Sequence, residues 1–85
     1  MKKITMFIQP RCPFCVKALK YIEEAKAKYP ELQPIEIEIH DELKEPEFAD
    51  TFDYYYVPTF YIDGEKVHEG GIYADEMADL LKKAL

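Results

Sequence analysis

Residues 4–22 read ITMFIQPRCPFCVKALKYI, and this stretch decides the fold of the chain. It begins in an apolar run over residues 3–8, which predicts a short buried strand that ends before Pro10. A helix is predicted from Cys12-Pro13 onward, because proline fits the first helical turn, where its missing N–H costs nothing. The only two cysteines of the chain therefore lie at a junction between a strand and a helix.

Apolar residues recur at helical spacing after the second cysteine, and Pro30 ends the helix that they predict. Residues 35–39 then alternate strictly between isoleucine and glutamate, which is typical of a half-buried strand. An acidic segment follows, in which a short helix is predicted from Pro46 through Phe52. The apolar face of the first helix comprises Ala18, Ile22, Ala25 and Tyr29, with Cys15 and Leu19 beside it.

Two further strands and a helix are predicted in the remainder of the chain. The strands, over residues 59–62 and 66–68, flank Asp63-Gly64, which is a strong signal for a hairpin turn. The last helix is predicted from about Ala74. Its apolar face comprises Met77, Leu80, Leu81 and Leu85.

The order of these elements is strand, helix, strand, helix, strand, strand, helix, or β-α-β-α-β-β-α. Strands that alternate with helices predict a parallel pair, and the closing hairpin adds an antiparallel one. The expected fold is therefore a three-layer α/β unit with a four-stranded mixed sheet and three helices. At 85 residues the chain is expected to form one domain over residues 1–85, because a second would lack the apolar surface to fold separately.

Composition and charge argue against several classes of function. Apolar residues make up 48% of the chain, enough for one compact core. The net charge of −6 argues against nucleic acid as a partner, because phosphate binding needs a basic face. No segment approaches the roughly 18 to 20 continuous apolar residues of a membrane span, and residues 4–8 are too few for the core of a secretion signal. We expect a cytoplasmic protein, and a monomer.

The spacing of the two cysteines favours redox chemistry over a structural role. A disulfide between them would close a very small loop and restrain little of the entropy of the unfolded chain. A thiol attacks a disulfide only as the thiolate, and a helix N-terminus would present unpaired N–H groups and the positive end of its dipole to Cys12. Arg11 adds a positive charge next to it. We therefore predict Cys12 as the nucleophile and Cys15, one turn into the helix, as the resolving thiol.

Metal binding is the alternative for the same pair. A Cys-x-x-Cys motif supplies two ligands, but zinc normally takes four, and the chain has no second such pair. His40 and His68 are the only histidines, and they belong to separate parts of the chain, where a surface role is the commoner one. A metal or iron–sulfur binding module that uses Cys12 and Cys15 is the second hypothesis.

Four short features occur in order along the chain. They are Cys12-Pro13-Phe14-Cys15 after a short strand, Val57-Pro58 before a strand, the Asp63-Gly64 hairpin, and Gly70-Gly71 before the last helix. In these features the chain resembles the dithiol glutaredoxins, which have Cys-Pro-Tyr-Cys at the first of them, and the resemblance covers essentially its whole length. It implies a thioredoxin-like fold in which Pro58 is cis and packs beside the active-site disulfide, while the backbone of Val57 pairs with the substrate.

The chain departs from this family at positions that hold glutathione. Gln9 stands where a lysine is common, and Tyr56 stands where threonine is usual. Ile72 and Tyr73 replace a small or polar residue and an aspartate. A charged hydrogen bond is typically worth about 1.5–3 kcal/mol, so the joint loss of several weakens binding. The chain is also similar to small thioredoxin-like proteins that a flavoprotein reductase reduces, so the expected electron donor is either glutathione or such a reductase.

The resemblance implies an oxidoreductase that reduces disulfide-containing proteins, or glutathione mixed disulfides, without a bound cofactor. Phe14 keeps an aromatic ring beside the first cysteine, and we expect it to pack against the substrate. In the run of three tyrosines from Tyr54 to Tyr56, one or two rings are expected in the core, and the last is expected to border the substrate groove. The residues expected to contact substrate are Arg11, Pro13, Phe14, Tyr56, Val57, Pro58 and Gly71.

Overall fold

The computed structural model describes all residues from Met1 to Leu85. Its elements follow the predicted order, with one short 3-10 helix added after the first α-helix. None of the helices has the length and apolar character that a membrane span requires. The elements are β1 (Ile4–Ile8), α1 (Pro13–Lys28), η1 (Pro30–Leu32), β2 (Ile37–Asp41), α2 (Pro46–Ala49), β3 (Thr59–Ile62), β4 (Glu65–Glu69) and α3 (Ala74–Lys82).

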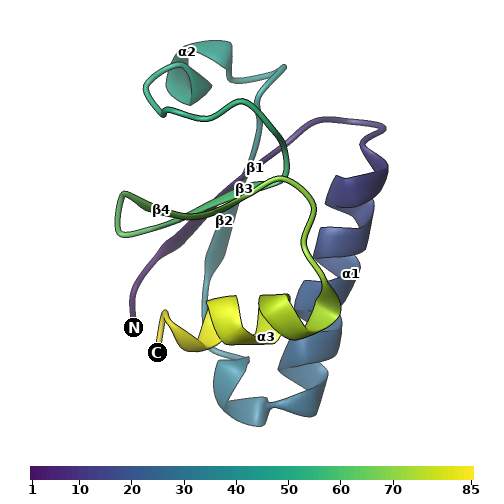
Figure 1. The fold of residues 1–85 in the computed structure, drawn as a ribbon. Coiled ribbons are helices and arrows are strands. Elements are labelled where there is room, and N and C mark those ends of the chain that lie inside the picture. The colour runs from purple at the N-terminus through teal and green to yellow at the C-terminus, as the bar shows by residue number, and fades with distance from the viewer.

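The four strands form one mixed sheet in the order β2-β1-β3-β4. β1 is parallel to β2 and antiparallel to β3, and β3 is antiparallel to β4. The β3–β4 turn has both central residues in the left-handed region, Asp63 at φ 50° and Gly64 at φ 85°, as the hairpin signal predicts. Figure 1 shows α1 and α3 on one face of the sheet and α2 on the other. The three-layer α/β fold is therefore confirmed.

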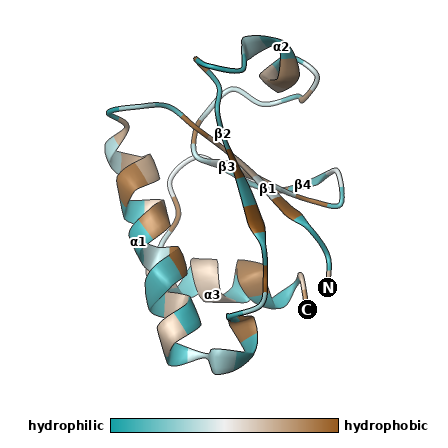
Figure 2. Cartoon of the chain, turned by 180° about the vertical axis from the view of Figure 1, so that it is seen from behind, coloured by the Kyte–Doolittle hydropathy of each residue, from teal (hydrophilic) through white to brown (hydrophobic).

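The main core lies between the sheet and the pair α1 and α3. Met6 of β1 and Phe60 of β3 are register partners and are both fully buried. Ala18 of α1 and Met77 of α3 belong to the same buried cluster. Figure 2 shows apolar residues concentrated on the strands and on the helix turns that face them. Each large side chain buried in this way contributes roughly 1.5–3 kcal/mol to folding.

An aromatic cluster covers the opposite face of the sheet, beside α2. The ring of Phe7 is fully buried there and lies 4.8 Å from the ring of Phe52 and 5.0 Å from that of Tyr54, centroid to centroid. Tyr61 of β3 meets Phe7 edge to face at 6.0 Å. The packing of these rings holds the loop before β3 against the end of β1. The residues that follow β1 lead to Cys12.

The second strand differs from its prediction in its first residue and in its exposure. β2 begins at Ile37, two residues later than the alternating pattern suggests, and Ile39 is 46% exposed. β2 is an edge strand that pairs only with β1, and of its isoleucines Ile37 packs partly buried against the main core whereas Ile39 is exposed. Ile35, which precedes the strand, is the buried member of the series.

Two helix ends also differ from their predictions. α2 stops at Ala49 rather than reaching Phe52, because the ring of Phe52 turns back to pack on Phe7. α3 stops at Lys82, so Leu85 lies beyond the helix and is exposed, while Ala84 is fully buried. The N–H of Lys2 donates to the carbonyl of Ala84 at 2.8 Å, which holds the two ends of the chain side by side (Figure 1).

Candidate active site

Cys12 is the N-cap residue of α1. Arg11 adopts a left-handed conformation at φ 63°, and this turn carries the chain from β1 into the helix. Cys12 itself is extended, at φ −92° and ψ 111°, and its sulfur accepts the backbone N–H of Cys15 at 3.2 Å. The sulfur therefore occupies the place where a capping oxygen usually satisfies a free N–H of the first turn. The N-terminus of a helix is a position that generally favours negative charge.

Cys15 lies one turn into α1 and is only 2% exposed. Burial raises the pKa of its thiol to about 12, and the hydrogen bond to Cys12 together with the charge of that neighbour adds to the rise. Both cysteines are free thiols in this structure. The pair thus consists of a partly exposed sulfur at the helix cap and a buried, protonated one behind it.

The loop before β3 faces the helix cap. The Val57–Pro58 peptide bond is cis, as the resemblance implies. The Sγ atom of Cys12 lies 3.9 Å from the carbonyl oxygen of Val57 and donates to it as a thiol. The hydroxyl of Thr59 donates to the carbonyl of Tyr56, which leaves Val57 at the tip of the loop beside Cys12.

Three exposed aromatic side chains lie along the Gly70-Gly71 segment. Phe14 is 58% exposed, Tyr56 70% and Tyr73 75%. The backbone of Gly71 lies against the Phe14 ring, where an added Cβ would be 3.1 Å from Cδ1 of Phe14. Glycine at this position therefore lets the ring lie against the chain. That Tyr56 borders a substrate groove stays a prediction, and Tyr54 is the one tyrosine of its run that packs in a core.

Arg11 and Pro13 are exposed on either side of Cys12 in the sequence. The Arg11 side chain makes no ion pair or hydrogen bond within the chain. The helix cap, rather than an arginine contact, is therefore the interaction that the structure supplies to the Cys12 sulfur. Contact of Arg11 and Pro13 with substrate stays a prediction.

Of the four positions that depart from the glutathione pattern, three have other partners in the fold. The amide of Gln9 donates to the carboxylate of Glu42. Ile72 is buried in the main core. Tyr73 is the N-cap residue of α3, and its backbone N–H donates to Glu76 at 3.1 Å. The Gln9 amide is therefore already engaged, and Ile72 offers only an apolar, buried side chain.

Glu42 is a site residue that the sequence does not reveal. It follows β2, accepts the hydroxyl of Tyr54 at 2.7 Å as well as the Gln9 amide, and its charge contributes to the raised pKa of Cys15. Burial and this hydrogen bond raise the pKa of Tyr54, so its hydroxyl remains a donor. These partners are 12 and 33 positions away in the chain, and no local pattern connects them.

Glu69, at the end of β4, is a second residue that the sequence does not reveal. Its carboxylate accepts the backbone N–H groups of Tyr55 at 2.7 Å and of Tyr56 at 3.0 Å. Lys66 pairs with the same carboxylate at 2.7 Å. The pairing with Lys66 and the two backbone bonds hold the pKa of Glu69 down at about 2. The one available signal is that an acid immediately precedes Gly70-Gly71.

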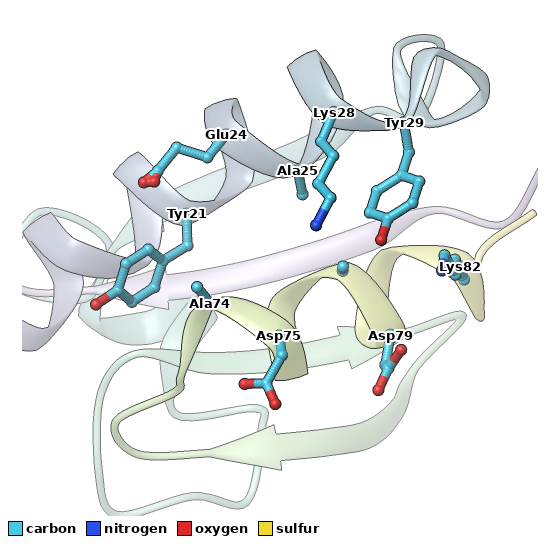
Figure 3. Close-up of a pocket in the computed structure, with 10 residues that line it drawn as sticks. Tyr21, Glu24, Ala25, Lys28, Tyr29, Ala74, Asp75, Asp79 and Lys82 are labelled. Atoms are coloured by element: carbon cyan, nitrogen blue, oxygen red, sulfur yellow. The ribbon is translucent and has the colours of Figure 1, made fainter.

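No group of three or more histidine, cysteine, aspartate or glutamate side chains is arranged to hold a metal ion. The alternative metal or cluster hypothesis therefore finds no further ligand beside the two cysteines within this chain. A groove of about 430 Å³ lies between α1 and α3 (Figure 3), but it includes neither cysteine. There the ammonium group of Lys82 lies 4.3 Å from the centroid of the Tyr29 ring, a cation–π contact that joins the two helices.

Comparison with known sequences and structures points to one superfamily. The family profile described as Glutaredoxin matches residues 4–67. A thioredoxin from Methanocaldococcus jannaschii is 29% identical over 83 residues, which are 98% of this chain and 95% of that protein. A thioredoxin-like protein, solved as a point mutant, is 28% identical with a TM-score of 0.62, covering 93% of this chain and 99% of that chain.

Two further structures share the fold. A protein disulfide oxidoreductase from Aeropyrum pernix is 26% identical with a TM-score of 0.71, and the match covers 98% of this chain and 37% of that chain. The oxidised thioredoxin of Plasmodium falciparum is similar in fold alone, at 20% identity and a TM-score of 0.73, over 99% of this chain and 82% of that chain. Because the matched family range includes both cysteines, the cis proline and most of the sheet, the chain belongs to the glutaredoxin family of thiol–disulfide oxidoreductases.

Proposed function

We propose that this chain reduces protein disulfides by dithiol exchange, with Cys12 as the nucleophile and Cys15 as the resolving thiol. One observation carries the proposal: the Cys12 sulfur caps α1 and faces the Val57 carbonyl, while the Cys15 thiol is buried one helical turn behind it. The cap stabilises a thiolate at the partly exposed sulfur, and burial keeps the second thiol protonated until it is needed.

The first step forms a mixed disulfide. The Cys12 thiolate attacks one sulfur of the substrate disulfide, a bond forms between them, and the substrate S–S bond breaks. The second substrate sulfur leaves as a thiolate and takes a proton from solvent. The chain is not yet fully oxidised at this point, because Cys12 is bonded to the substrate sulfur and not to Cys15.

The second step releases the substrate. Cys15 loses its proton, attacks the Cys12 sulfur and forms the Cys12–Cys15 disulfide, while the remaining substrate sulfur leaves and is protonated. Two electrons have then passed from the chain to the substrate. Once Cys12 is in the mixed disulfide it carries no charge, so two of the causes that raise the pKa of Cys15 are removed at the step in which Cys15 must ionise.

We further propose that a flavoprotein reductase, rather than glutathione, returns the electrons. Gln9 is engaged with Glu42, Ile72 is buried and Tyr73 begins a helix, so the positions that usually anchor glutathione offer it no charge. The exposed aromatic rings of Phe14, Tyr56 and Tyr73 form instead a surface suited to a protein partner.

Reduction of insulin disulfides tests the activity and its donor together. With dithiothreitol as a donor-independent reductant, the chain is expected to accelerate insulin reduction well above the uncatalysed rate. NADPH oxidation is then compared with two coupling systems, a panel of thioredoxin reductases and glutathione with glutathione reductase. Activity with the first system alone supports the proposal. Activity only with the glutathione system contradicts the proposal that a flavoprotein reductase is the electron donor. If the chain does not accelerate insulin reduction by dithiothreitol, the proposed disulfide reductase function is itself contradicted.

A further inference from the structure

The end of β4 holds the loop that faces Cys12. The Glu69 carboxylate accepts the N–H groups of two successive loop residues, Tyr55 and Tyr56. Gly70, the residue that follows the strand, donates its N–H to the carbonyl of Pro58 at 2.8 Å. The backbone on both sides of Val57 is therefore held by the end of β4, with Glu69 bonded to Tyr56 before it and Gly70 bonded to Pro58 after it.

The carboxylate is itself fixed in place. Lys66, on the same strand, binds its other oxygen and also donates to the carbonyl of Asp53 at 3.1 Å, where the loop begins. The hydroxyl of Tyr61 donates to the same carbonyl at 2.8 Å. Lys66 and Asp53 are the charged groups around Glu69, and Tyr61 is the titratable group that faces this cluster from β3. Each end of the loop thus has a side-chain anchor on β3 or β4.

These contacts connect Glu69, through the loop, to the sulfur of Cys12. Glu69 bonds to the N–H of Tyr56, Tyr56 is joined to Val57, and the Val57 carbonyl lies 3.9 Å from the sulfur of Cys12. Two N–H donors on one carboxylate oxygen specify the direction of the backbone as well as its position. Without the carboxylate, both N–H groups would lose this acceptor, and the backbone around Val57 would be held only by the bonds from Thr59 to Tyr56 and from Gly70 to Pro58.

We propose that Glu69 is a positioning residue for substrate binding, whose carboxylate orients the Val57 backbone for pairing with an extended segment of a disulfide-containing protein. This inference rests on the proposed function. It assigns no direct contact between Glu69 and substrate. It predicts a selective effect, because a protein substrate needs the oriented backbone, whereas a small reagent needs only the Cys12 sulfur.

Glu69→Ala tests the proposal, with Glu65→Ala as the matched control. Glu65 lies on the same strand, is exposed and makes no hydrogen bond or ion pair through its side chain, so the control removes the same charge without touching the loop. In insulin reduction with dithiothreitol, the Glu69 variant is expected to raise KM about tenfold with kcat nearly unchanged. Alkylation of Cys12 by iodoacetamide is expected to proceed at the wild-type rate in both variants.

The conservative variant Glu69→Gln separates positioning from charge. Its amide oxygen can still accept the two backbone N–H groups, although it loses the pairing with Lys66. We therefore expect its KM to lie between those of the wild type and Glu69→Ala. A Glu69→Gln KM equal to that of Glu69→Ala would show that the backbone bonds carry no part of the effect, and would overturn the proposal.

An NMR titration supplies a readout that does not depend on activity. The pKa of Glu69 is about 2, below its ordinary value of 4.5, so the bonds it accepts persist above 4.5 and are lost only as pH falls through about 2. The chemical shifts of the Tyr55 and Tyr56 amide protons are expected to change with pH around that low midpoint. In Glu69→Gln, which has no carboxyl group at this position, this change is expected to be absent. A midpoint near 4.5 would contradict the contact.

The outcomes distinguish the two proposals. A wild-type chain without insulin reductase activity refutes the proposed function, whatever the amide titration shows. If the wild type is active and Glu69→Ala has the same KM, the positioning role of Glu69 is refuted, while the proposed function is not. A Glu69→Ala chain that alkylates slowly at Cys12, or that loses activity through kcat rather than KM, also refutes it, because the effect is then not confined to the substrate-pairing loop.

Discussion

Cys12→Ser is expected to lower the rate of disulfide reduction by about a thousandfold or more, to the uncatalysed level. A serine hydroxyl retains the capping position at the start of α1 and still accepts the N–H of Cys15. It remains un-ionised at neutral pH and cannot form a disulfide, so no mixed disulfide with the substrate results. Insulin reduction with dithiothreitol as the reductant measures the loss.

Val16→Ser serves as the matched control for this variant. Val16 is exposed in the first turns of α1, so the substitution introduces the same side chain into the same helix without altering either thiol. Its activity should match that of the wild type. Reduction by Cys12→Ser at a rate comparable with this control would transfer the nucleophilic role to Cys15 and invalidate the proposed order of attack.

Cys15→Ser is expected to stop the reaction after its first step. Cys12 still captures one sulfur of the substrate, but no thiol remains behind it to break the mixed disulfide. With a thioredoxin reductase as the electron donor and neither glutathione nor dithiothreitol present, turnover should fall at least about a hundredfold, while a covalent complex accumulates. Mass spectrometry should show one substrate chain per variant chain, and dithiothreitol should release it.

The double variant, Cys12→Ser with Cys15→Ser, provides the background for this trapping experiment and should form no complex. Peptide mapping of the trapped species should place the bond at Cys12. A Cys15→Ser chain that turns over at the wild-type rate without glutathione or dithiothreitol would show that the buried thiol has no resolving role. The reaction would then proceed through Cys12 alone.

The sequence predicts the fold well where local pattern and packing agree. The apolar run of β1, the proline at the start of α1 and the Asp63-Gly64 turn all appear as expected, because each is determined by nearby residues. The prediction is less accurate for β2, whose isoleucines alternate as in a half-buried strand although the strand lies at a sheet edge. Strand order depends on the whole topology, and an alternating pattern does not reveal it.

The candidate site shows the same division. The two cysteines and the Val57–Pro58 element could be found from the sequence, since each belongs to a short motif with a chemical reason. Glu42 and Glu69 could not, because each acts on residues at least a dozen positions away in the chain. In the sequence they are two members of a set of 17 acidic residues, most of which a reader would assign to the solvated surface.

The central claim is that the two thiols of the reduced chain differ, with a reactive sulfur capping the helix and a protonated one buried behind it. Brief treatment of the reduced wild type with limiting iodoacetamide at about pH 7, followed by peptide mapping, tests this most directly. The pKa of Cys15 is raised to about 12, so it should stay unlabelled while Cys12 carries the single adduct. Equal labelling of the two cysteines, or labelling of Cys15 first, would contradict the account.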